Sequence, residues 1–299
     1  MCIAFIRHIQ IKEIKKNNIK VHNRSVIPDP GSEYGAGLIR NPDYLNTWIH
    51  LFFILLFLFF LPRTIRAEEI YLPFQPGEKL FFELKWSLIP AGEAVLEVLP
   101  TTIVNGVECH HFVLTANTNT FVDNFYKVRD RIDAFEDIKM TRSLFFKKKQ
   151  REGRSIKDIM IEFDWNKNQA QYSNFGDKLN PIPILPGTFD PLSAFYYTRM
   201  FNWSEHKEVQ RPVTDGKKRI TGKAVRIKRQ TIKVPAGTFD TYLFEPDIEH
   251  VGGIFERSKN AKIELWVTAD KNRIPVKLKS KVVVGSFTGE LVFATGVNK

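Results

Sequence analysis

The chain contains only two cysteines, Cys2 and Cys109, among its 299 residues. If an N-terminal leader is removed, Cys109 remains alone, which excludes an internal disulfide. A cysteine-based zinc site is excluded too, because such sites combine several Cys and His ligands at short spacing. We interpret Cys109 as a buried structural thiol, and we expect a hydrophobic core to stabilise the fold.

The sequence also lacks the short motifs of common enzymes. It has no GxSxG nucleophile elbow, no HExxH motif and no glycine-rich phosphate loop. His110 and His111 are adjacent, so on a strand they point to opposite faces and cannot bind one metal together. We therefore predict no catalytic residues, no metal and no cofactor.

No apolar run is long enough for a typical membrane span. The longest, Trp48–Leu61, has 14 residues, whereas a spanning helix needs about 20. Pro62 follows it, and Ala67 offers a small residue before a cleavage point. We interpret residues 48–67 as a signal peptide; an uncleaved anchor, which would be the chain's one link to the membrane, and a core helix are the alternatives. The absence of cysteine near its end argues against a lipoprotein anchor.

Residues 1–47 precede this segment and are polar without sustained periodicity, so we expect them to be disordered. A signal peptide normally starts near the N-terminus, and we therefore hypothesise that translation begins later, near Leu38 to Leu45. Residues 68–299 would then form a single β-rich domain.

Nucleic acid is not expected as a partner. Nine of the 44 Lys and Arg and four of the 33 Asp and Glu lie in residues 1–67, so the remainder has a net charge of about +6. The basic run 217–233 contains eight Lys and Arg but no aromatic residues, which nucleic-acid grooves usually add. A solvated strand face is one interpretation, and contact with anionic lipid or glycan is the other.

Alternating apolar and polar residues are the main structural signal after residue 70. In 79–86, Leu80, Phe82, Leu84 and Trp86 share one face, which is typical of a strand. A second strand follows at 93–98, and "LIPAG" between them predicts a tight turn. Further strands are predicted at 107–117, 126–134, 141–150, 155–164, 169–174, 219–229, 231–234, 239–247, 261–268, 273–283 and 285–296, with 147–155 as a polar hairpin tip turning at Gly153.

One segment near the middle of the chain predicts a helix. Asp190 is suited to cap it, and Pro191 suits its first turn. Leu192, Phe195, Tyr196 and Arg199 then fall on one stripe. We predict a mostly β fold: a strongly curved antiparallel sheet, half-barrel or sandwich-like, of about a dozen strands, with one short amphipathic helix near 190–201 covering its concave face.

The segment "VRDRIDAFED" places Asp130 on the apolar face of a strand, where a carboxylate needs a partner. Arg199 on the helix stripe is our predicted partner, and we interpret the pair as a link between helix and sheet. A ligand-headgroup site and a catalytic site are the alternatives.

Three stretches then point to a family: "PFQPGEKLFFELKWSLIPAGEAVLEV" (73–98), "GTFDPLSAFYYTR" (187–199), and "VPAGTFDTYLFEPDI" with "IELWVTADKNRIPVKLKSKVVVGSFTGELV" (234–292). They resemble the bacterial envelope family filed as domain of unknown function 3108. The resemblance implies an exported, mostly β protein in the periplasm or at the outer-membrane periphery of a Gram-negative bacterium. It implies no activity.

Aromatic residues supply the functional hypothesis. Of 25 Phe, six precede residue 68, and the rest can line either a filled core or an acyl-chain pocket. We expect a non-enzymatic envelope protein that binds a lipid or other hydrophobic molecule beneath the helix, lined by Phe82, Trp86, Phe195 and Tyr196, with Arg199 near a polar headgroup. A structural or assembly factor that docks through the basic 217–233 face is the alternative, and an envelope hydrolase is the third.

Overall fold

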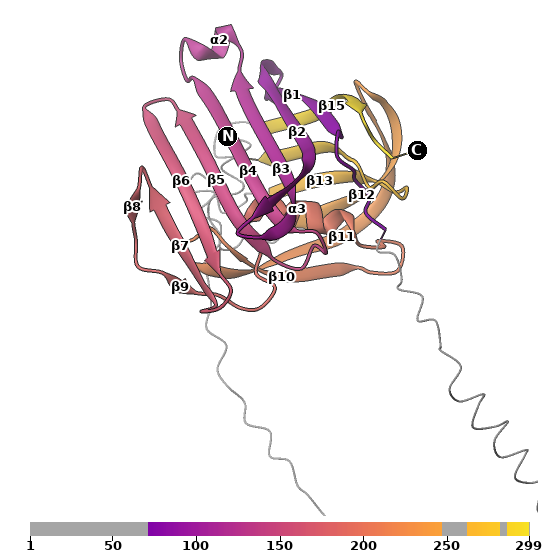
Figure 1. Ribbon diagram of the computed structural model, residues 1–299. Helices are drawn as coiled ribbons and strands as arrows, with labels where there is room; N and C mark the ends of the chain where they lie inside the picture. Colours follow the sequence, from indigo (N-terminus) through magenta and orange to yellow (C-terminus); the bar gives the residue numbers. More distant parts are fainter. Residues whose placement is uncertain (1–70, 247–261, 282–285, 299) are drawn as a thin grey trace, which may run out of the picture. The chain divides into compact units, whose positions relative to one another are not determined.

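A computed structural model describes residues 71–246, 262–281 and 286–298, and the predicted N-terminal segments 1–47 and 48–67 lie outside these residues. Within the described ranges, strands of one antiparallel sheet account for most of the chain (Figure 1). The strands are β1 (Lys79–Trp86), β2 (Ile89–Val104), β3 (Val107–Thr118), β4 (Val128–Asp137), β5 (Ser143–Glu152), β6 (Ser155–Asp164), β7 (Gln169–Asn174), β8 (Asp177–Lys178), β9 (Ile182–Pro183), β10 (Glu208–Thr214), β11 (Arg219–Val234), β12 (Gly237–Pro246), β13 (Lys262–Thr268), β14 (Pro275–Lys281) and β15 (Ser286–Thr295).

The sheet has fifteen strands within the described ranges, and the prediction of a mostly β fold is confirmed. Along the sheet the strands lie in the order β10, β11, β12, β13, β14, β15, β1, β2, β3, β4, β5, β6, β7 and β8, and β9 pairs with β7. The first and last long strands, β1 and β15, are therefore neighbours in its middle.

The two ends of the sheet curve toward each other. The turn between β10 and β11 contains Gly216, and a Cβ built there would lie 3.0 Å from the side chain of Ile161 and 3.1 Å from that of Tyr172. These two residues belong to β6 and β7, near the opposite end of the strand order. The turn therefore packs against the inner face of strands to which it is not hydrogen-bonded in the sheet.

The alternation read from the sequence sets which face of each strand is buried. In β4, Val128, Asp130, Ile132, Ala134 and Glu136 are buried, and the residues between them are half-buried or exposed. This is the period of two expected for a strand with one face on a core. Two of the five inward residues are carboxylic acids, so the core contains ionisable groups that require partners.

The predicted turn "LIPAG" is wrong. Trp86 pairs with Ile89, so the turn consists of Ser87 and Leu88, and Pro90 and Gly92 lie inside β2. A β-bulge next to Pro90 takes up the irregularity that the proline introduces. Gly92 is required there because a Cβ would lie 2.0 Å from the carbonyl oxygen of Asn117 on β3.

The later strands differ from prediction in two places. Residues 219–234 form the single strand β11 rather than two strands, with a register shift between Arg226 and Lys228. The edge strand β10 was missed because Pro212 interrupts its pattern, and an edge is where a sheet tolerates proline. The short elements α2 (Thr120–Asp123), β8 and β9 were missed as well.

The predicted helix is present as α3 (Pro191–Arg199). The side chain of Asp190 accepts hydrogen bonds from the backbone N–H groups of Leu192 at 2.9 Å and Ser193 at 3.0 Å, as an N-cap should. The helix packs against β3, β4 and β10, and Figure 1 shows it between the two halves of the sheet.

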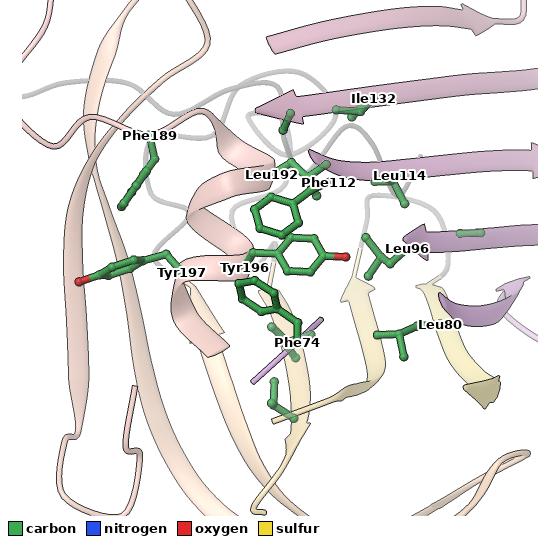
Figure 2. Packing of buried hydrophobic residues seen from close by; sticks show 14 of the residues in the cluster. Phe74, Leu80, Leu96, Phe112, Leu114, Ile132, Phe189, Leu192, Tyr196 and Tyr197 are labelled. Atoms are coloured by element: carbon green, nitrogen blue, oxygen red, sulfur yellow. The ribbon is translucent and has the colours of Figure 1, made fainter. Parts of the chain in front are cut away.

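Aromatic rings fix α3 against the sheet (Figure 2). The ring of Tyr196 stacks on that of Phe112 from β3, with centroids 3.9 Å apart. Phe74 meets both rings edge to face, at 5.4 Å from Tyr196 and 5.2 Å from Phe112. Such contacts add to the hydrophobic gain of burying the rings, so this part of the concave face is solid core.

Candidate ligand-binding site

An apolar groove of about 90 Å³ lies beside α3 on the inner face of the sheet. The first three strands, α3 and the last three strands all contribute to it. Its lining residues are Phe82, Leu84, Ala94, Leu96, Leu114, Pro191, Leu192, Phe195, Leu265, Pro275, Lys277, Leu278 and Gly289. Nearly all of these side chains are hydrocarbon, so the groove selects for apolar groups.

The structure brings together two of the predicted lining residues and leaves the others outside the groove. Phe82 and Phe195 line it. Trp86 lies near the end of β1 and is 44% exposed, and Tyr196 is fully buried in the aromatic core. The sequence pattern could not show which part of the inner face is filled by side chains and which part is left open.

Arg199 does not lie at a headgroup site, and its predicted pair with Asp130 does not form. Its guanidinium donates to both carboxylate oxygens of Glu78, at 2.6 and 3.0 Å, and both side chains are 1% exposed. It also donates to the backbone carbonyls of Pro73 and Asn272. Arg199 is therefore a structural anchor between α3, the segment before β1 and the turn after β13.

Asp130 has a different partner, Lys148, on the neighbouring strand β5. The Lys148 ammonium lies 3.8 Å from its carboxylate, and the backbone N–H of Arg151 donates to it at 2.8 Å. Burial raises the pKa of Asp130 to about 6, although Lys148 opposes the shift. Asp130 does need a partner, as predicted. The partner comes from the neighbouring strand β5, where Lys148 lies diagonally across from Asp130.

A polar row continues across the inner face from Asp130. Gln150 on β5 is opposite Asp130, and Lys157 on β6 is opposite Gln150. Gln150 is 3% exposed, yet neither atom of its amide group has a hydrogen-bond partner in the described residues. Buried amides rarely stay unpaired, so this end of the inner face contains hydrogen-bonding groups that no described residue satisfies.

The interpretation of 147–155 as a polar hairpin tip is wrong, because much of this segment belongs to β5. Only Gly153 and Arg154 form the turn, while Lys148 and Gln150 are buried inside β5. Extending the period of two from Leu144 and Phe146 predicts both side chains as inward. Their charge and polarity concealed that signal.

A second hollow of about 300 Å³ lies over these strands, and we call it the lysine compartment. Its floor is the inner face of β5, β6 and β7, and its other side is the turn between β10 and β11. The lining residues are Phe146, Lys148, Lys157, Ile159, Ile161, Tyr172, Pro191, Asp215, Lys217 and Lys218. Pro191 also lines the apolar groove, so the two hollows meet at the first residue of α3.

A buried pair of acidic residues, Glu136 and Asp190, lies at the N-terminal cap of α3. The hydroxyl of Ser143 is 3.0 Å from a carboxylate oxygen of Glu136 and 2.7 Å from one of Asp190, and Ser193 donates to the same Asp190 oxygen. Burial, reinforced by the neighbouring Asp190 charge, raises the pKa of Glu136 well above 4.5. Burial also raises the pKa of Asp190. We assign this group to the helix cap, since all four side chains are fully buried.

The residues considered for metal or thiol chemistry are consecutive, but their side chains have different partners. His110 approaches the carbonyl of Ile138, and His111 approaches the carboxylate of Asp133. Burial raises the pKa of the Cys109 thiol, which suits an inert core residue. Across 71–246, 262–281 and 286–298, no three His, Cys, Asp or Glu side chains could hold a metal ion. No helix in those same ranges has the length and apolarity to cross a membrane.

The basic run 217–233 divides into different environments. Lys223 pairs with Glu208 at 2.9 Å, and Arg229 pairs with Asp240 at 2.5 Å. Lys217 and Lys218 line the lysine compartment, whereas Lys228 and Lys233 are exposed. The run is therefore not a uniform solvated face.

These observations define a β-rich protein whose open, curved sheet encloses one helix and two adjoining hollows, one apolar and one basic. The model of the family "Protein of unknown function (DUF3108)" matches residues 82–292. The chain belongs to this family, as the sequence motifs predicted. No curated protein matches the chain.

One solved structure shares its fold at low sequence identity, and two others align over most of the chain with low TM-scores. A beta-barrel-like protein of domain of unknown function DUF1849 from Brucella abortus is 12% identical, with a TM-score of 0.51, and the match covers 74% of this chain and 98% of that one. A candidate lipoprotein from Parabacteroides distasonis is 11% identical with a TM-score of 0.28, covering 76% of this chain and 100% of its own. A candidate exported protein with a YmcC-like fold from Bacteroides fragilis has the same identity and TM-score, covering 76% and 99%.

Proposed function

We propose that this chain is a non-enzymatic protein of the bacterial envelope that binds a hydrophobic molecule, such as a lipid acyl chain, in the apolar groove. The groove itself is the observation that supports the proposal: apolar side chains from six elements, together with Gly289 of β15, surround an unfilled space of about 90 Å³. Folding normally fills such space, because each unfilled volume forfeits packing energy. Binding an apolar ligand recovers that energy.

The volume limits what the groove holds. A cavity of about 150 Å³ accommodates benzene, so a hollow of about 90 Å³ takes a short apolar segment rather than a whole lipid. Each methylene group transferred from water contributes about 0.8 kcal/mol. The half-buried ring of Phe195 lines the groove next to the helix, so its side chain is placed to contact a ligand that extends beyond it.

Export to the envelope rests on the predicted signal peptide and on the family resemblance. The proposal includes no catalytic step, because the sequence contains none of the nucleophile, metal or phosphate-loop motifs considered above.

A substitution that fills the groove tests the proposal. Ala94 on β2 is 5% exposed and lines the groove, so Ala94→Leu places additional carbons inside it. The matched control is Val95→Leu, on the opposite face of the same strand. Calorimetric titration with dodecanol should give an affinity at least about tenfold lower for Ala94→Leu, and no change for Val95→Leu. Equal binding by both variants would contradict the groove as the site.

Native mass spectrometry provides an independent test. Protein purified from envelope extracts should carry a hydrophobic small molecule that organic solvent removes. Repeated recovery of ligand-free protein, together with no dodecanol binding, would refute the proposal.

Docking to an outer-membrane or cell-wall partner through Lys217, Lys218, Arg219 and Lys223 is the alternative. It has less support, since Lys223 is paired and the first two residues line a hollow rather than a protruding face. Crosslinking that is lost when these four charges are reversed would favour it.

A further inference from the structure

The lysine compartment adjoins the apolar groove, and together they have the polarity of an amphiphile. Pro191 lines both hollows, so the two hollows come together at this residue. One is bordered by hydrocarbon, and the other is bordered by four lysines and one aspartate. An uncharged hydrophobic ligand would make no use of the charges of Lys217 and Lys218.

The carboxylate of Asp215, the one acidic side chain in the lining, is engaged by the backbone of its own turn. It accepts the backbone N–H groups of Lys217 at 2.9 Å and Lys218 at 3.1 Å, which hold the turn in shape. The Lys217 ammonium lies 4.4 Å from the ring centre of Tyr172 on the compartment floor, so it is oriented inward. No salt bridge of Lys217 or Lys218 occurs in the part of the chain that the structure describes.

A buried polar side chain next to the compartment shows that this end of the sheet is polar. Gln150, with both amide atoms unpartnered, lies on the same face of β5 as Lys148 and opposite Lys157. Gln150 does not itself line the compartment. The polar character of the sheet therefore continues beyond the lysines that do.

The size of the compartment suits a headgroup. About 300 Å³ lies at the lower end of the range of about 300–1,000 Å³ for small-molecule sites. Its floor of Phe146, Ile159, Ile161 and Tyr172 is apolar, so it accepts a group whose carbon skeleton contacts the sheet while its charge meets the lysines.

We infer that the ligand of the apolar groove is an anionic amphiphile, and that its phosphate or carboxylate head binds in the lysine compartment. This inference rests on the proposed function, because it assigns a head to the same ligand. Lys217 and Lys218 contribute charge from the β10–β11 turn, Lys157 contributes it from the sheet beside the Lys148–Asp130 pair, and Pro191 lies between head and chain.

Calorimetry with three probes tests the inference in 150 mM salt, which screens exposed charges. The probes are dodecyl phosphate, dodecanol and inorganic phosphate. The wild-type chain should bind dodecyl phosphate at least about tenfold more tightly than dodecanol. It should bind inorganic phosphate far more weakly than either, because the groove then stays empty.

The variant Lys217→Glu/Lys218→Glu should lose at least about tenfold in affinity for dodecyl phosphate and keep its affinity for dodecanol. The matched control, Lys228→Glu/Lys233→Glu, reverses two exposed charges on β11, the strand that follows the β10–β11 turn, and should bind both probes as the wild type does. Unfolding midpoints of both variants establish that they are folded.

The outcomes separate the two claims. If dodecanol binds but the compartment variant has no effect on dodecyl phosphate, or no more than the control, the anionic head is refuted and the apolar groove stands. If inorganic phosphate binds as tightly as dodecyl phosphate, the compartment is a site for free phosphate and the amphiphile is refuted. If neither dodecyl probe binds, the proposed function fails and the inference fails with it.

Discussion

Replacing Arg199 with methionine should destabilise the fold more than any exposed charge change. Its guanidinium forms two hydrogen bonds with Glu78, at 2.6 and 3.0 Å, in a site where both side chains are 1% exposed. Removing one partner of a buried ion pair leaves an uncompensated charge and costs about 3–5 kcal/mol. At an m-value of about 3 kcal/mol per molar, the urea midpoint should fall by roughly 1–2 M.

Two further variants give this prediction its controls. Arg131→Met makes the same substitution at an Arg–Asp pair in which the arginine is 45% exposed, and it should cost no more than about 1 kcal/mol. Glu78→Leu/Arg199→Met removes both charges and should recover much of the lost stability. A cost for Arg199→Met as small as that of Arg131→Met would refute the assignment of Arg199 as a structural anchor.

The remaining predictions concern the helix cap and the buried thiol. Burial raises the pKa of Glu136 well above 4.5, so its contribution to stability is complete below that pH and is lost as the pH rises through the folded-state value. Glu136→Gln should therefore unfold at a higher urea concentration than the wild type at pH 8, and at a similar one near pH 4. Parallel pH profiles of the two proteins would contradict this. Asp190→Ala should cost about 1–2 kcal/mol of unfolding free energy through loss of the N-cap, whereas Asp190→Asn, which keeps a capping oxygen, should cost less by the same urea titration. Cys109 is fully buried with a raised pKa, so in a chain starting at residue 68 a thiol reagent should label nothing in the folded state and one thiol in urea; rapid labelling without urea would show that the thiol is accessible.

Local patterns in the sequence predicted much of the fold. Alternation identified β3, β6 and β7 to within a residue at each end, because one face of each strand is buried and side chains alternate with a period of two. The start of α3 could be predicted because its cap is formed by Asp190 and the N–H groups of the next residues, all within four positions. Both signals depend on neighbours in the chain.

The candidate site was less predictable because its contacts join distant residues. Arg199 and Glu78 are 121 positions apart, and nothing local distinguishes Glu78 from Asp130 as a partner. Lys148 points to the inner face of β5. Charged residues are rarely buried unless paired, so the sequence pattern predicted an exposed position for it. Phe82, Trp86, Phe195 and Tyr196 were all expected around one pocket, and only the first and third line the groove, because the packing of rings decides which space is filled.

The pairing of β1 with β15 has a consequence for how this sheet is assembled during folding. Lys79 is opposite Thr295, so the middle of the sheet stays unjoined until nearly the last residue of the chain is available, while most other neighbouring strands follow each other directly in the chain. Contacts of such long sequence separation form slowly. Until then two long unpaired edges, those of β1 and β14, are available for wrong pairing, and a chain truncated before residue 286 would keep them permanently.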